Sequence, residues 1–168
     1  MLKVFKPRSR IRDEFGFGVI EILIVASIIS VAFIGIVQLS VLSIRPIDAS
    51  VRQAEAVALA EEAIEAVRVL RNESWSGNVV PLSDSTTYYP VISSGNWTLT
   101  ATDPGPIRGT YTRGIVLSPV YRDGNDNISD SGTLDSETRK ITATTTWSER
   151  GSDRTIVLET YLTNFLDN

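Results

Sequence analysis

Residues 17–44 read FGVIEILIVASIISVAFIGIVQLSVLSI, and this stretch decides how the rest of the chain is organised. Its strongly polar members are Glu21 and Gln38; the serines between them are tolerated in a helix. A helix of these 28 residues would be roughly 42 Å long, which exceeds the roughly 30 Å hydrocarbon core of a bilayer. The stretch therefore predicts a membrane-spanning helix.

The flank of this apolar stretch predicts its orientation. Residues 1–16 contain five basic and two acidic side chains, a balance of +3, whereas the whole chain carries −4. Basic residues mark the cytoplasmic end of a membrane helix, so we expect a single-pass protein with a cytoplasmic N-terminus and an extracytoplasmic C-terminal region. A cleavable secretory signal would have an apolar stretch of only about 7–15 residues followed by a small-x-small site, and neither feature is present.

Glu21 is the unusual residue of the stretch, because a carboxylate in a membrane helix is costly unless it reaches the interface or finds a partner. One interpretation is that its side chain extends to the lipid headgroups. The other is that it has a functional partner.

The run Gly16-Phe17-Gly18-Val19-Ile20-Glu21, after its short basic leader, resembles the prepilin signature of type IV pilins and type II secretion pseudopilins. The resemblance implies that a membrane peptidase cuts between Gly16 and Phe17 and methylates the new amino terminus on Phe17. It also places the family's glutamate, the fifth residue after the cut, at Glu21. Two positions depart from the family pattern, since Gly18 stands where threonine is common and Val19 where leucine is.

This resemblance gives Glu21 a specific partner. Cleavage creates a positive amine on Phe17 in apolar surroundings, and the Glu21 of a neighbouring subunit, or the glutamate of another subunit type, would neutralise it. Two buried charges that are separately costly become tolerable as a pair, so the contact would select the register between subunits more than add net stability.

The helical pattern changes after the apolar stretch. Arg45-Pro46 predicts a kink or a restart of the helix, because proline lacks an amide hydrogen and disfavours helical geometry in the residue before it. Residues 45–74 then predict an amphipathic helix that ends near Asn72. Its Ala-rich face is expected to pack on the protein's own sheet, and its acidic face is either solvated or a partner site. The apolar face comprises Ala56, Leu59, Ala60, Ala63, Ile64, Val67 and Leu70, and the acidic face Glu55, Glu61, Glu62 and Glu65.

Residues 75–168 predict a β-rich head. Alternating β-branched, aromatic and polar residues indicate strands over 96–102, 110–121, 138–147 and 154–163, separated by glycine-containing turns as in an antiparallel meander. Residues 76–95 predict a long irregular connection with one edge strand over 88–92. The expected fold class is α+β: a long N-terminal helix packed on one face of a small antiparallel sheet, with the other face solvated, as in pilins.

One loop of the head has the residue types of a calcium site. Asp123, Asn125, Asn127 and Asp130 offer side-chain oxygens at near-alternate positions. No glycine follows Asn127, however, and Leu134 occupies the position of the bidentate glutamate of an EF-hand. An acidic hairpin loop that binds no metal is the alternative. No other cofactor is expected.

Composition excludes several kinds of active site. The chain has no cysteine and no histidine, which removes disulfides, thiolate metal sites and histidine-dependent triads. The remaining candidate for catalysis, a pair of carboxylates, has no spacing to recommend it, so we expect no enzyme. Nucleic-acid binding is not expected either, because the region after the leader is acidic and Arg108, Arg113 and Arg122 are scattered.

The resemblance implies that this chain is an assembly protein. The resemblance implies a minor pilin or minor pseudopilin with residues 1–16 as a cleaved leader, 17–44 as the transmembrane and filament-core helix, 45–74 as the amphipathic helix and 75–168 as the head. Its implied partners are other pilin or pseudopilin subunits, the prepilin peptidase, an inner-membrane assembly platform and the lipid bilayer. The alternative is an uncleaved, signal-anchored binding domain outside the cytoplasmic membrane.

Overall fold

The computed structural model describes residues 18–168, except for the side chains of residues 42–45. Gly16 and Phe17, the expected cleavage residues, lie outside the described residues. The chain divides into two compact units, one that ends at Ile47 and one that comprises Asp48–Asn168.

A single helix, α1 (Val19–Glu73), contributes residues to both units. It begins where the backbone amides of Glu21 and Ile22 donate to the carbonyl of Gly18. The helix continues through Pro46, so it does not restart there, and the kink that was the other expectation at Arg45-Pro46 stays a prediction. A proline costs a helix one backbone hydrogen bond, and here the residues on both sides keep helical geometry despite that loss.

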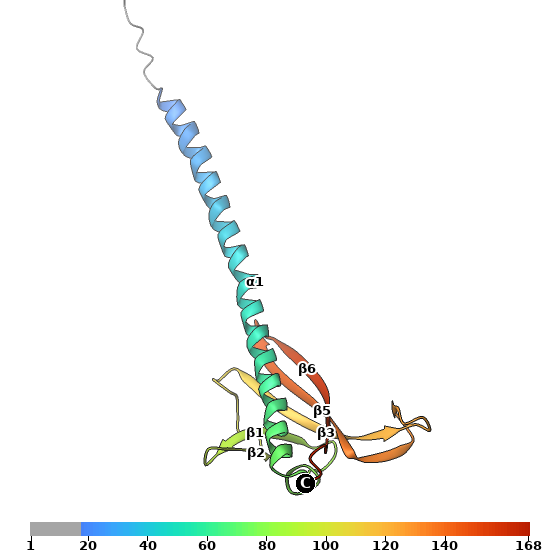
Figure 1. Cartoon of the computed structure of the whole chain (residues 1–168). Helices are drawn as coiled ribbons and strands as arrows, with labels where there is room; N and C mark the ends of the chain where they lie inside the picture. Colours follow the sequence, from blue (N-terminus) through green and yellow to red (C-terminus); the bar gives the residue numbers. More distant parts are fainter. Residues whose placement is uncertain (1–17) are drawn as a thin grey trace, which may run out of the picture. The chain divides into compact units, whose positions relative to one another are not determined.

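The remainder of Asp48–Asn168 contains a short helix and six strands among the described residues (Figure 1). The elements are α2 (Trp75–Asn78), β1 (Thr87–Ser93), β2 (Asn96–Thr100), β3 (Tyr111–Arg122), β4 (Ile128–Ser129), β5 (Thr133–Glu149) and β6 (Ser152–Thr163). All pairings are antiparallel, and the order across the sheet is β2-β1-β3-β5-β6, with β4 paired to β3. The expected α+β class is confirmed.

The order of the strands corrects two expectations. The strand expected at the sheet edge is β1, but β1 lies between β2 and β3, and β2 is the edge strand. The sheet is therefore not a simple meander, because β2 turns outward and the chain returns through residues 101–110 to pair β3 with β1. Residues 76–95 are also less irregular than expected, since they contain most of α2 as well as β1.

Two tight turns fix the register of the hairpins. Ser94-Gly95 joins β1 to β2, and Arg150-Gly151 joins β5 to β6. All four turn residues have positive φ, which is the geometry of the type I′ turn that matches the twist of a hairpin. Glycine at the second position of each turn adopts this geometry without steric cost.

The core lies between the alanine face of α1 and the sheet. Ala56, Ala60, Ala63 and Val67 are fully buried, as expected, whereas Leu59 is only half-buried. Ala60, Ala63 and Val67 pack with inward side chains of β3, β5 and β6, which include Ile115, Leu117, Ile141, Ala143 and Leu162. Ala56 belongs to a second buried cluster, with Tyr111 of β3 and Trp147 of β5. Alternation along β5 also follows the sequence, because Ile141, Ala143, Thr145 and Trp147 are buried and the threonines between them are partly exposed. Alanine allows the helix to approach the sheet closely.

Residues 163–168 fasten the C-terminal end of α1 to the sheet. Arg71 donates to the carbonyl of Thr163 at 2.9 Å, and its guanidinium lies 4.3 Å from the ring centroid of Phe165. The Asn168 side chain accepts a hydrogen bond from the amide of Trp75 and donates one to the carbonyl of Asn72. The backbone and side-chain amides of Asn164 both donate to Glu137 of β5.

Gly132, before β5, is required by the fold. Its φ is +141°, and a Cβ atom there would lie 2.1 Å from the carbonyl oxygen of Arg122. We therefore predict that Gly132→Ala lowers the free energy of unfolding by about 1–3 kcal/mol. The matched control is Gly124→Ala, because a Cβ at Gly124 meets no atom within 4 Å and should change stability by less than about 0.5 kcal/mol. Denaturant unfolding of the detergent-solubilised chain, followed by circular dichroism, measures both; equal effects would contradict the prediction.

Candidate functional site

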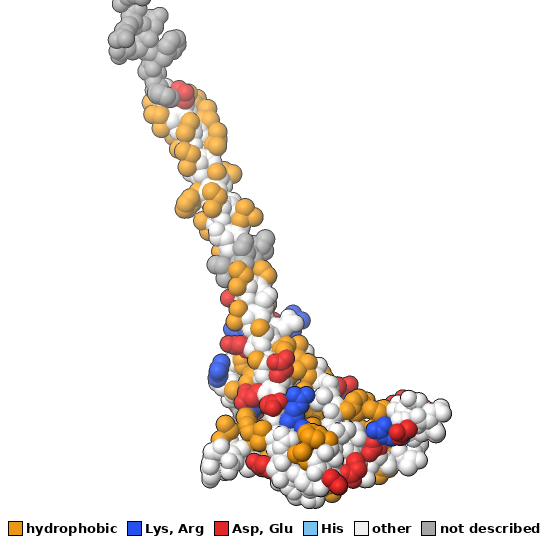
Figure 2. Space-filling view, in the orientation of Figure 1, with side chains coloured by type: hydrophobic (Ala, Val, Ile, Leu, Met, Phe, Trp, Pro, Cys, Tyr) orange, Lys and Arg blue, Asp and Glu red, His pale blue; other side chains and the backbone are white. Residues whose placement is uncertain are grey.

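The first candidate site is the N-terminal part of α1. Glu21 lies in its first turn and is exposed. The large apolar side chains from Val19 to Val41 are all strongly exposed within the chain (Figure 2). This part of α1 is long and apolar enough to cross a membrane. An exposed apolar surface of this extent needs lipid or other protein to cover it.

The serines of this segment do not require such a partner for their hydroxyls. Ser27, Ser30 and Ser40 each donate a hydrogen bond to the backbone carbonyl four residues earlier, at 2.7, 2.7 and 3.0 Å. Local bonding of this kind satisfies a hydroxyl inside lipid. Glu21 is different, because its carboxylate makes no hydrogen bond or ion pair with any residue that the structure describes.

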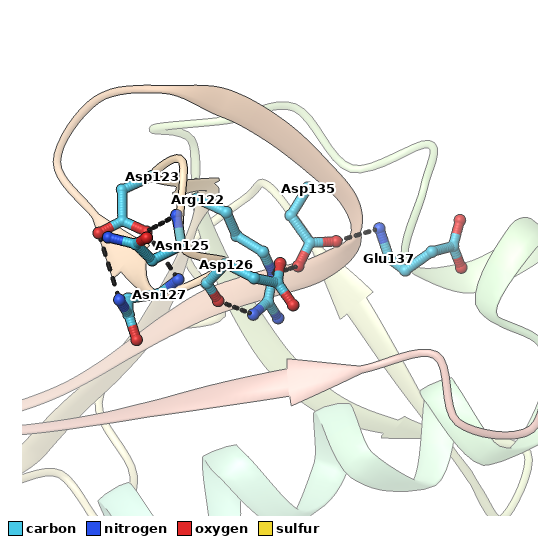
Figure 3. A network of polar contacts seen from close by, with 7 residues as sticks. All are labelled: Arg122, Asp123, Asn125, Asp126, Asn127, Asp135 and Glu137. Atoms are coloured by element: carbon cyan, nitrogen blue, oxygen red, sulfur yellow. Dashed lines mark hydrogen bonds and ion pairs between the residues drawn. The ribbon is translucent and has the colours of Figure 1, made fainter.

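The second candidate is the acidic loop between β3 and β5. The Asp123 carboxylate accepts hydrogen bonds from the backbone amides of Asn125 and Asn127, at 2.8 and 2.9 Å, and from the Asn127 side chain at 3.3 Å (Figure 3). These bonds hold the pKa of Asp123 below its usual value. The donors of this group are thus the backbone amide of Asn125 and the backbone and side-chain amides of Asn127, and Asp130 makes no hydrogen bond to the group in the described chain.

Arg122 holds the two ends of the same loop together. Its Nε lies 2.7 Å from a carboxylate oxygen of Asp135 and 3.6 Å from one of Asp126 (Figure 3). Burial acts to raise the pKa of Asp135, but hydrogen bonds from Arg122, Thr138 and the Glu137 amide outweigh it and keep that pKa below its usual value.

Within residues 18–168, no group of three or more acidic side chains is arranged to hold a metal ion. Of the four predicted oxygen donors, Asp123 already accepts hydrogen bonds from the amides of its own loop. Calcium binding here stays a prediction, which a calorimetric calcium titration would test.

A third polar group joins the helix to the sheet, and the sequence analysis missed it. The side chain of Arg113 on β3 is only 6% exposed and lies 2.9 Å from the Glu62 carboxylate on α1. It also donates to the carbonyls of Leu59 and Pro90, and its guanidinium lies 5.8 Å from the Trp97 ring centroid. The sequence did contain a sign that Arg113 is buried, because the two-residue alternation of a strand puts it on the same face as Tyr111, Ile115 and Leu117.

The acidic face of α1 is therefore only partly a free surface. Besides the Glu62 contact, Glu55 accepts a 2.6 Å hydrogen bond from the Tyr111 hydroxyl. Burial, together with this bond, raises the pKa of Tyr111. Glu65 is exposed and pairs with Arg68 along the helix. The Arg113–Glu62 and Tyr111–Glu55 contacts thus link α1 to β3, whereas the Glu65–Arg68 pair lies within α1.

Comparison with known proteins adds no assignment: a scan against protein-family models, a search of curated proteins and a search of solved structures each returned no match to this chain.

The Arg122–Asp135 contact predicts a pH dependence. The folded-state pKa of Asp135 lies below the ordinary value of 3.8, so the stabilisation is present above that value and is lost as the pH falls through the folded-state pKa. We predict that Arg122→Met destabilises the head most at about neutral pH, and that its difference from the wild type shrinks below about pH 4.

Urea unfolding at a series of pH values measures this difference. Arg154→Met is the control, because Arg154 is 62% exposed and 3.6 Å from Glu149, and such surface pairs contribute about 0–1 kcal/mol. A pH-independent effect of Arg122→Met would contradict the prediction.

Proposed function

We propose that this chain is a prepilin-like assembly subunit, a minor pilin or minor pseudopilin of a type IV pilus-like or type II secretion-like filament. The observation that carries the proposal is the position of Glu21: a carboxylate in the first turn of a helix whose neighbouring side chains are apolar and exposed. The basic leader and the Gly16-Phe17 junction, at the spacing described above, support it.

In this proposal the exposed apolar segment is covered by lipid before assembly and by neighbouring subunits afterwards. Before assembly, the bilayer covers residues 19–41, with the basic leader in the cytoplasm and the head outside. After cleavage and N-methylation, neighbouring subunits take the place of the lipid. Glu21 would then pair with the amine of Phe17 on a neighbour, which makes the burial of both charges tolerable in one register.

The remainder of the chain fits a structural part in assembly. Its polar contacts, such as Arg113–Glu62 and Arg122–Asp135, hold the head together. The proposed partners are the prepilin peptidase, an inner-membrane assembly platform and other pilin or pseudopilin subunits. No catalytic role is proposed for any residue.

The proposed cleavage predicts the mass of the mature chain. In cells that contain a prepilin peptidase, the membrane-extracted protein should have the mass of residues 17–168 plus one methyl group. Gly16→Val should leave the protein at full length, because it puts a branched side chain directly before the proposed cleavage point, where the family has glycine. Gly18→Ala is the control and should be processed, since a Cβ there meets no atom closer than 4.0 Å. Intact mass spectrometry decides, and a full-length wild-type protein would favour the uncleaved, signal-anchored binding domain instead.

Glu21 is predicted to be needed for assembly and not for cleavage. Glu21→Val should give a processed chain that no longer co-purifies with sheared filaments, because the amine of a neighbour then lacks its carboxylate. Ser30→Val, the matched control in the same segment, removes a hydroxyl that bonds only to its own helix and should assemble normally. Immunoblots of the sheared and membrane fractions measure how much of each variant is incorporated into filaments. Detection of the Glu21→Val chain in filaments would contradict the proposed pairing.

A further inference from the structure

Gln38 is a polar side chain of the apolar segment that the proposed function does not use. Its primary amide has two donor hydrogens and an acceptor oxygen. No residue in the described part of the chain bonds to it, whereas Ser27, Ser30 and Ser40 are bonded to their own backbone. Inside lipid, an amide with no partner is costly, and a neighbouring helix is the usual source of one.

Gly35 lies one turn before Gln38 and has no explanation within its own chain. A Cβ atom added there would meet nothing within 4 Å, so no intrachain packing requires glycine. Glycine in a helix interior costs about 1 kcal/mol relative to alanine. In membrane helices, small residues permit the close approach of a second helix. Gly35 and Gln38 therefore mark the same side of α1 as a contact surface.

Two β-branched side chains, Ile24 and Val31, lie on the same side of the helix as Gln38. Ile24, Val31 and Gln38 are spaced seven apart, so they lie on one face with Gly35 beside them. In two-stranded parallel coiled coils, β-branched residues at such positions favour dimers, and a single polar amide among them fixes register and orientation.

We propose that two copies of this chain form a parallel dimer in the membrane, with the Gln38 side chains hydrogen-bonded to each other across the contact. A second copy is the occupant because an amide is complementary to itself. Two copies of one single-span chain also insert in the same orientation, which puts both Gln38 side chains at the same depth. The inference rests on the proposed membrane location and not on filament assembly.

Cysteine cross-linking tests the dimer, and the natural chain contains no cysteine to interfere. Val31→Cys places a thiol on the proposed contact face and keeps Gln38. Ile29→Cys, at nearly the same depth, places it on the opposite face of the helix, because two residues turn a helix by about 200°. A disulfide needs Cα atoms within about 7 Å. Oxidation of membranes should therefore give a cross-linked dimer with Val31→Cys and little with Ile29→Cys.

The amide is tested in the Val31→Cys chain. Adding Gln38→Leu should reduce the cross-linked fraction roughly three- to tenfold, the effect expected for one interhelical hydrogen bond, and adding Gln38→Asn should restore most of it. Equal cross-linking from both faces, or no effect of Gln38→Leu, would overturn the proposal and would be the result if Gln38 only extends to the headgroups.

The outcomes also separate this proposal from the proposed function. Absence of the chain from the membrane fraction would remove both. A chain that is membrane-embedded and processed but does not cross-link would remove the dimer alone. Cross-linking of a chain that is never cleaved would keep the dimer and remove the pilin-like function.

Discussion

Packing of the alanine face of α1 against β3 and β5 is the interaction on which the rest of the head depends. Ala56, Ala60 and Ala63 have no exposed surface, so the backbone of the helix lies close to the sheet along two turns. Larger side chains at these positions would push the two layers apart, since a close-packed core does not absorb added volume without strain. The buried strand residues, Ile115 and Ile141 among them, are covered only because the helix lies this close.

Close approach of the layers also determines where charge is tolerated. At the border between α1 and the sheet, two long side chains of β3 are buried, and each is paired with a glutamate of α1 that is still partly exposed. Arg113 meets Glu62, and Tyr111 meets Glu55. An arginine that loses its carboxylate in such a place is strongly destabilising, whereas the intact pair adds little net stability. These contacts are best understood as fixing where the helix lies on the sheet.

The sequence predicted those parts of the structure that depend on local periodicity. The buried face of residues 56–70, the alternation along β5 and the apolar character of 19–41 all follow from spacing alone. The order of the strands could not be predicted in this way, because β1 pairs with β3 at Thr87 and Tyr88, and no local sequence pattern indicates that pairing. The helix continues through Pro46 without a restart; the proline alone did not decide between a restart and a kinked, continuing helix, because the turns on both sides also determine whether the helix persists. At the candidate sites, Glu21 could be singled out from the sequence, but the bonding of Asp123 to the amides of its own loop could not.

The place of Leu162 in the core has a consequence for biosynthesis. This residue of β6 belongs to the same buried cluster as Ala60 and Ala63, so the core cannot close before the ribosome has translated nearly the whole head. Until then the alanine face of α1, made first, has no sheet to cover it. The apolar segment that precedes it is complete much earlier and is available for membrane insertion while the strands are still being synthesised. Folding of the head is therefore expected to finish only after the apolar helix is complete.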